Sequence, residues 1–272
     1  CKELPAVFLE ILQGIHQQIH QLPPDGRKDD RAFRPGRIRR KGAPMGYRHE
    51  LKFLMSPGEA EFLATRLRLT LSQDPYAARN GGKYLIRSLY FDTPYERAVE
   101  EKVSGVEFRD KYRIRIYNFS DKTIKFERKH KNSQFIKKDS LGLTRAQCDA
   151  VLNGETEFLL HRKEPFAREL YASIRTEYLR PRVLVDYERE PFVFPLEDVR
   201  ITFDRNVRTS MRCTELFNPH VPTYPATEYG DCCILEVKFN KYLPGYVRDL
   251  IQVGAASHVA ARKYLVCRQF DF

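Results

Sequence analysis

The sequence lacks the cysteine spacing of a zinc-binding or disulfide-stabilised domain. Its six cysteines include no C-x-x-C pair, and the adjacent Cys232 and Cys233 fall within a predicted strand. A zinc site is therefore not expected, and a disulfide framework is not indicated for a chain of 272 residues. We expect reduced thiols and, with them, a cytoplasmic location.

Long apolar runs and familiar nucleotide-binding motifs are also missing. No run approaches the roughly 20 residues that span a bilayer, so we expect no transmembrane segment, and we expect no signal peptide. The chain contains neither G-x-x-x-x-G-K-[ST] nor G-x-G-x-x-G, and it has no RNP-like stretch with clustered aromatics. Nucleic acid is accordingly not the expected ligand, although sequence-nonspecific RNA binding remains the last of the alternatives.

Positive charge is what the sequence has in excess. The 47 Lys and Arg outnumber the 36 Asp and Glu, which gives a net charge of +11. Such a balance predicts an acidic partner: a nucleic acid, a nucleotide, polyphosphate or an anionic membrane. The 42% of hydrophobic residues suffice for a substantial core in one large domain or two small ones.

The order of predicted elements indicates an α+β fold. Residues 1–46 read as an N-terminal helix followed by a basic linker, and 47–272 as the folded domain. Capping-box spacing predicts helices that open at Ser56 and Thr93, and a helical pattern predicts a further helix that opens at Thr144. Strands are predicted at 47–54, 83–92, 106–118, 121–131, 134–140, 181–189, 199–206 and 232–239. About eight strands in meander-like runs predict an antiparallel sheet that closes into a β-barrel.

Several of these strands carry a charged residue at every second position. Because strand side chains alternate between two faces, each such strand is apolar on one face and ionic on the other. The ionic sets are Lys111, Arg113 and Arg115; Lys125, Glu127, Lys129 and Lys131; Arg200 and Asp204; Glu236 and Lys238; and Glu50 and Lys52. One such strand is typical of a solvated sheet face, whereas several together indicate a sheet that encloses a polyanion.

The residue types on this face suit phosphate chemistry. Arginine offers phosphate a planar fork and lysine a point charge. Isolated carboxylates among the cations could share a divalent metal ion with phosphate oxygens, since Mg²⁺ or Mn²⁺ needs only one or two of them. Glu236 is the best candidate ligand, and a structural ion pair is the equally weighted alternative.

Short motifs in a consistent order resemble those of triphosphate tunnel enzymes of the CYTH-like superfamily. The opening strand at 48–53 contains E-x-K, and 88–93 reads S-L-Y-F-D-T. The segments at 111–115, 126–129, 199–204 and 235–238 are closest to the VTC (vacuolar transporter chaperone) type of polyphosphate polymerase. The resemblance extends from about Tyr47 to Val266.

This resemblance implies a closed antiparallel tunnel with helices outside, and transfer of the ATP γ-phosphate to a growing polyphosphate chain with Mn²⁺ or Mg²⁺. By matching positions it implies catalytic roles for Arg113, Arg115, Lys129 and Glu236, the last as metal ligand. It implies phosphate binding by Lys52, Arg189, Arg200 and Lys263, with Lys131 and Lys137 or Lys138 as further candidates. The alternation of charge adds Lys111, Lys125 and Lys238 as candidate phosphate-binding residues. Arg189 falls on the opposite alternation from Asp186 and Glu188, so its direction depends on strand register.

Two departures from the pattern keep alternatives open. The terminal motif reads Arg-Lys-Tyr at 262–264 instead of Ser-Lys-Tyr, and the opening strand carries one glutamate where the hydrolytic relatives pair two. The second departure disfavours a two-metal triphosphatase. A tunnel that only binds polyphosphate or inositol phosphates is the main alternative, and a separate membrane protein is a partner that the family implies.

Overall fold

The computed structural model describes residues 49–132, 135–210, 213–226, 231–251, 257–258 and 263–268. The N-terminal helix and basic linker predicted for 1–46 lie outside these residues, so the predicted division into two parts stays a prediction. Within the described ranges, no helix is long and apolar enough to cross a membrane.

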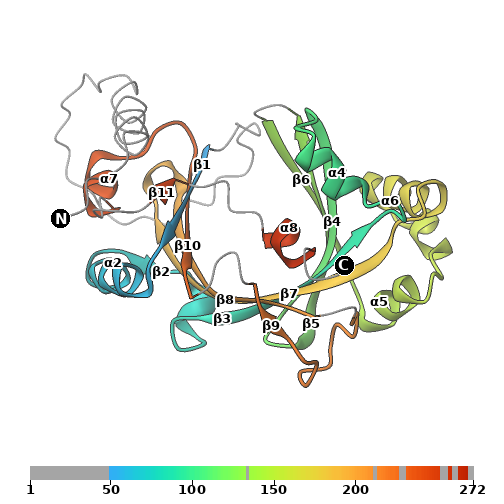
Figure 1. Ribbon diagram of the computed structural model, residues 1–272, viewed down its shortest axis with the longest axis horizontal. Coiled ribbons are helices and arrows are strands. Elements are labelled where there is room, and N and C mark those ends of the chain that lie inside the picture. The colour runs from blue at the N-terminus through green and yellow to red at the C-terminus, as the bar shows by residue number, and fades with distance from the viewer. Residues whose placement is uncertain are drawn as a thin grey trace, which may run out of the picture. The chain divides into compact units, whose positions relative to one another are not determined.

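One antiparallel sheet organises the domain (Figure 1). Its hydrogen-bonded order is β11-β1-β10-β8-β7-β3-β4-β5-β6, while β2 pairs with β7 and β9 with β8. The strands are β1 (His49–Met55), β2 (Ser72–Gln73), β3 (Tyr84–Asp92), β4 (Phe108–Tyr117), β5 (Ser120–Asn132), β6 (Phe135–Leu143), β7 (Arg180–Phe194), β8 (Val199–Thr209), β9 (Tyr224–Pro225), β10 (Cys233–Phe239) and β11 (Ser257–His258).

The prediction of a closed barrel is wrong, although the α+β class and the antiparallel sheet are as expected. Among the described strands, β6 forms one edge of the sheet and β1 with β11 the other, and no backbone ladder joins the two edges. The sheet curves so that β1, β10 and β8 face β4, β5 and β6 (Figure 1). Lys129 of β5 instead reaches Glu50 of β1 at 3.3 Å. Because the side chains of Lys129 and Glu50 meet end to end, β5 and β1 lie farther apart than the roughly 4.8 Å that separates hydrogen-bonded strands.

Of the two predicted capping boxes the one at Ser56 forms, and a further box forms at Thr144, which was predicted only to open a helix. Ser56 pairs with Glu59 at the start of α2 (Pro57–Thr70), and Thr144 pairs with Gln147 at the start of α5 (Arg145–Leu152). The box predicted at Thr93 is wrong, because α4 (Arg97–Val103) begins later and has no side-chain cap at its N-cap residue. Asp92 instead accepts from the Thr93 and Ala98 backbone amides, at 2.8 and 3.0 Å.

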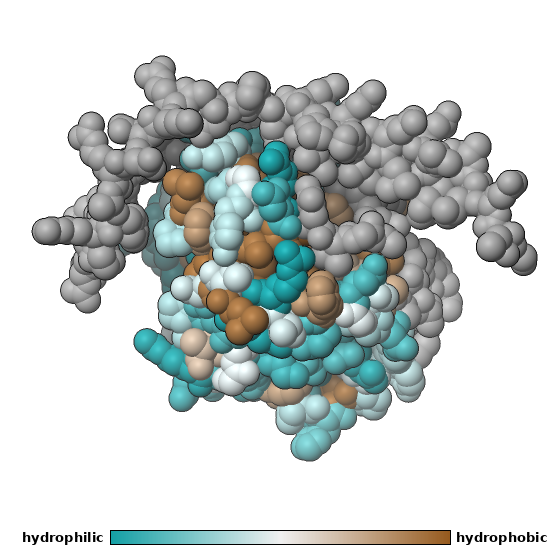
Figure 2. Space-filling view, turned by 90° about the vertical axis from the view of Figure 1, so that its left-hand side faces the viewer, coloured by the Kyte–Doolittle hydropathy of each residue, from teal (hydrophilic) through white to brown (hydrophobic). Residues whose placement is uncertain are grey.

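The remaining helices are α3 (Pro75–Ala78), α6 (Pro165–Thr176), α7 (Gly245–Ile251) and α8 (Lys263–Arg268), with 3₁₀ turns at Glu157–His161 and Leu196–Asp198. Helices α5 and α6 cover one apolar region of the convex face, and α2 and α7 cover another. Figure 2 shows the side that carries α2, where apolar side chains are interspersed among hydrophilic ones.

Helix α8 departs from the expected arrangement, because it packs on the concave face (Figure 1). Its Tyr264 and Cys267 are buried against Tyr90 of β3 and Val183 and Val185 of β7. The Tyr264 hydroxyl donates to Asp92 Oδ2 at 2.5 Å. The concave face is therefore apolar beneath α8 and ionic beyond it.

A buried ion pair connects β3 and β7 on the convex face. Arg87 is 1% exposed and donates to both oxygens of Asp186, at 2.9 and 2.7 Å, and to the Asn218 carbonyl. We expect Arg87→Ala to lower the free energy of unfolding by about 3–5 kcal/mol, because it leaves the buried carboxylate of Asp186 without its cationic partner. Urea denaturation measures the loss. Arg145→Ala, which removes an exposed pair with Asp149, is the control and should cost less than about 1 kcal/mol; equal losses would contradict the prediction.

Candidate functional site

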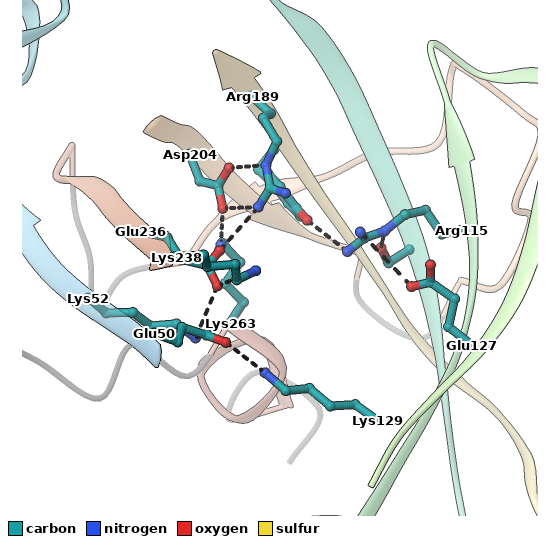
Figure 3. Close-up of polar contacts among 12 residues, drawn as sticks. Glu50, Lys52, Arg115, Glu127, Lys129, Arg189, Asp204, Glu236, Lys238 and Lys263 are labelled. Carbon is teal, nitrogen blue, oxygen red and sulfur yellow. Dashed lines mark hydrogen bonds and ion pairs between the residues drawn. The ribbon is translucent and has the colours of Figure 1, made fainter. Parts of the chain in front are cut away.

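Charged side chains from the two facing walls of the sheet meet on the concave face (Figure 3). The first wall contributes Glu50 and Lys52 from β1, Glu236 and Lys238 from β10, Asp204 from β8 and Arg189 from β7. The second contributes Arg113 and Arg115 from β4, Glu127 and Lys129 from β5, and Lys138 from β6. Antiparallel register explains the grouping, since directly opposed residues share a face: Lys52 opposes Glu236, Arg113 opposes Glu127, and Arg189 opposes Asp204.

Glu127 is the anionic centre of the second wall. It is 2% exposed and lies 2.8 Å from Arg113 Nη2, 4.0 Å from Arg115 Nη1 and 2.5 Å from Lys138 Nζ. Burial alone would raise the pKa of this carboxyl, but Arg113, Arg115 and Lys138 lower it to about 2. Glu127 is therefore ionised at neutral pH and holds three cations in place.

Asp204 plays the same part on the first wall. It is fully buried and accepts two hydrogen bonds from Arg189, both at 2.7 Å, and a further one from Lys263 of α8. Burial opposes ionisation, yet Arg189 and Lys263 lower the pKa of Asp204 to about 2. Arg189 thus points to the concave face, and α8 brings Lys263 to the same carboxylate.

Glu236 lies between these groups and the edge strand. Its carboxylate is 2.8 Å from Lys238, 3.5 Å from Arg189 and 3.9 Å from Lys52. Burial would raise the pKa of Glu236, but Lys238, Glu50, Lys52 and Arg189 together hold it well below its usual value. The ionic side chains therefore form a network of alternating charge in two groups, one around Glu50, Glu236 and Asp204 and one around Glu127 (Figure 3).

Lys129 of β5 reaches across from the second wall to Glu50 of β1 on the first wall. Burial, together with the cations Lys52 and Lys238, lowers its pKa to about 8, although Glu50 favours the charged form. A lysine is charged below its pKa and becomes neutral as the pH rises through that value. The network therefore loses positive charge just above neutral pH.

This titration gives a prediction for anion binding. We expect the affinity for inorganic tripolyphosphate to fall about ten-fold between about pH 7 and about pH 9 as Lys129 becomes neutral. In Lys129→Arg the side chain stays charged, so the fall should largely disappear; Lys137→Arg, on the opposite face of β6, is the control. Calorimetric titration with tripolyphosphate at several pH values measures the affinity of each protein. A fall of equal size in all three proteins would contradict a role for Lys129.

Other predicted cations lie on the same face of the sheet. Lys125 opposes Arg115, Lys111 opposes Lys129, and Arg200 opposes Lys238. Lys111 lies 5.3 Å from the ring centroid of Tyr264. Within the described part of the chain, Lys125, Lys131 and Arg200 form no ion pair.

Hydroxyl groups near the arginines were missed by the sequence reasoning. Arg113 donates to the Tyr90 hydroxyl at 3.1 Å, and Arg115 donates to the Tyr187 hydroxyl at 2.9 Å and to Ser88 at 3.3 Å. Burial would raise the pKa of Tyr187, but Arg115 and Arg189 lower it. The alternation along each strand could have identified them. Ser88 and Tyr90 are two residues apart and so share one face of β3, and Tyr187 lies two residues before Arg189 on the same face of β7.

The carboxylates of this face fit a metal ion only if it shares phosphate oxygens. Among the described residues, no group of three or more His, Cys, Asp or Glu is placed to hold a metal ion. Glu236 is surrounded by Lys238, Lys52 and Arg189, which balance its charge. Mg²⁺ and Mn²⁺ accept one or two carboxylates when phosphates and water complete the coordination. The donor set therefore fits a metal ion that arrives with a polyphosphate ligand.

Comparison with known proteins identifies the fold and the family. A candidate adenylyl cyclase of Hippeastrum, HpAC1, described as having a dominant triphosphatase activity, superposes with a TM-score of 0.52 at 15% identity, covering 82% of this chain and 96% of that one. A candidate adenylate cyclase of Bacillus halodurans gives 0.43 at 14% identity, covering 75% of this chain and 84% of that one. No curated protein matches the sequence. The model of the VTC domain matches residues 47–270, and the chain therefore belongs to the VTC domain family.

Proposed function

We propose that this domain is an ATP-dependent polyphosphate polymerase. In the reaction, a terminal phosphate oxygen of the growing chain attacks the γ-phosphorus of ATP, the bond between that phosphorus and its bridging oxygen breaks, and ADP leaves. No protein nucleophile is needed. The observation that carries the proposal is the network of arginines and lysines along one concave face, each held by a carboxylate.

The arginines are suited to the transferring phosphate. Arg113 and Arg115 lie on adjacent same-face positions of β4, and Glu127 orients both guanidinium groups. Phosphoryl transfer depends on positioning and on neutralising the charge of the phosphate oxygens. We assign these two residues to the γ-phosphate, and Lys52, Lys129, Arg189, Lys238 and Lys263 to the phosphates on either side.

Lys111, Lys125, Lys131 and Arg200 extend this assignment as secondary phosphate contacts. Glu236 would hold a divalent metal ion, Mn²⁺ or Mg²⁺, which would withdraw charge from phosphate oxygens when bound. The carboxylates that pair with these cations also affect release of the product. Because each cation of the network is already paired, an entering phosphate chain exchanges one partner for another, and the product can dissociate.

Two other functions use the same face. The triphosphatase activity described for the Hippeastrum protein makes hydrolysis of tripolyphosphate the second candidate, and a binding-only domain is the third. Incubation with ATP and Mn²⁺ separates them by product. A polymerase yields ADP and phosphate chains that lengthen with time, a triphosphatase yields free phosphate, and a binding domain leaves ATP intact.

A cytoplasmic location and a membrane protein that receives the chain belong to the same proposal. Co-purification of the full-length protein with membranes, lost after high-salt washing, would support such a partner.

A further inference from the structure

Three tyrosine rings gather at one end of the concave face. Tyr84 of β3 and Tyr117 of β4 pack against the apolar cluster beneath α8, and Tyr76 approaches from α3. The ring centroids of Tyr76 lie 4.9 Å from Tyr84 and 5.9 Å from Tyr117, and those of Tyr84 and Tyr117 are 5.8 Å apart. The interplanar angles of 81°, 63° and 65° are those of edge-to-face packing.

The position of this cluster is fixed by a short hydrogen-bond chain. Asn118, in the turn between β4 and β5, donates to the Asn80 side chain at 3.2 Å and accepts from the Leu85 amide at 2.8 Å. Asn80 in turn donates to the Tyr76 carbonyl at 2.7 Å. Tyr76 is nevertheless 43% exposed, so part of its ring remains available to a ligand.

The cluster lies directly beside the phosphate-binding arginines. Tyr84 opposes Arg189 across the β3–β7 ladder, and Tyr117 follows Arg115 by two residues on the same face of β4. Two residues of a strand span about 7 Å. A ribose and its first phosphate fill such a separation between a stacked base and an arginine that holds the next phosphates.

We infer that these tyrosines form the nucleobase subsite and so give the site a direction. This rests on the proposed function, because it requires a nucleoside triphosphate as phosphate donor. The base stacks on the exposed Tyr76 ring, the triphosphate runs past Arg189 and Arg115, and the phosphate chain leaves past Lys131. Lys131 is six residues from Lys125 along β5, a distance of about 20 Å. Stacking tolerates any base, so the subsite favours large purines without selecting adenine over guanine.

Comparison of two ligands tests the subsite. Calorimetric titration with ATP and with inorganic tripolyphosphate is applied to the wild type, Tyr76→Ala and Tyr76→Phe. Loss of one stacked ring should weaken ATP binding about ten-fold and leave tripolyphosphate binding unchanged. Tyr76→Phe keeps the ring and should bind both ligands as the wild type does. GTP should bind within about two-fold of ATP, which follows from stacking.

The outcomes separate the subsite from the polymerase proposal. If Tyr76→Ala binds ATP as tightly as the wild type, or loses both ligands equally, the subsite is overturned and the polymerase proposal stands. Tyr117→Leu, which keeps an apolar side chain at a half-buried position, provides a second variant with the same expected pattern. If the wild type binds neither ligand, the proposed function falls and the subsite falls with it.

Discussion

Replacement of Arg113 with alanine is expected to lower the kcat of ATP-dependent chain elongation about a thousand-fold. An arginine that stabilises the charge of a transferring phosphate contributes at least this much in other phosphoryl-transfer enzymes. Removal of Arg113 leaves Glu127 with Arg115 and Lys138, so the carboxylate keeps ionic partners and the fold should persist. Steady-state formation of ADP and of phosphate chains measures the effect.

Two further variants make this result specific. Arg113→Lys keeps the charge but loses the planar fork, so it should recover only part of the activity. Arg128→Ala removes an arginine from the opposite face of β5, where it pairs with Asp139 and Glu169, and should leave kcat within about two-fold if stability is preserved. Equal losses in Arg113→Ala and Arg128→Ala would show a general effect on folding.

Replacement of Glu236 with glutamine should reduce metal-dependent activity about a hundred-fold or more while leaving metal-free anion binding intact. The amide keeps the size of the side chain but removes the charge that would hold a divalent ion. It also frees Lys238 and Lys52 from their shared carboxylate, so inorganic tripolyphosphate should bind without metal at least as tightly as to the wild type. Activity and calorimetric binding therefore move in different directions.

The matched control for this substitution is Glu188→Gln. Glu188 lies on β7 and forms an exposed pair with Lys83 at 3.2 Å, so its replacement should change neither readout. Full activity in Glu236→Gln would remove Glu236 from the metal site and favour the binding-only interpretation. A joint loss of activity and of metal-free binding would assign Glu236 to the structure of the network alone.

The identity of the concave-face residues followed from alternation along single strands. Lys111, Arg113 and Arg115 had to share a face of β4, because side chains of a strand alternate with a period of two. The same rule grouped Glu127 with Lys129, and Glu236 with Lys238. The two helix starts at Ser56 and Thr144 were equally local, since a capping box forms between residues three positions apart.

Residues that act across strands could not be grouped in this way. The sequence offered no reason to join Lys129 to Glu50, which are 79 positions apart, or Lys263 to Asp204, which are 59 apart. The predicted helix start at Thr93 was wrong for a similar reason. Asp92 bonds the first amides of the turn and is itself held by Tyr264, a residue 172 positions away.

The sequence by itself determined the antiparallel strands, the alternation of charge and the family, because each depends on short motifs and on the local geometry of a strand. Only the tertiary structure decided that the sheet stays open, that α8 lies on its concave face and that three tyrosines meet at one end of it. These features depend on how the edges of the sheet approach one another. That approach is set by sheet curvature and by the length of opposed charged side chains, which no single segment encodes.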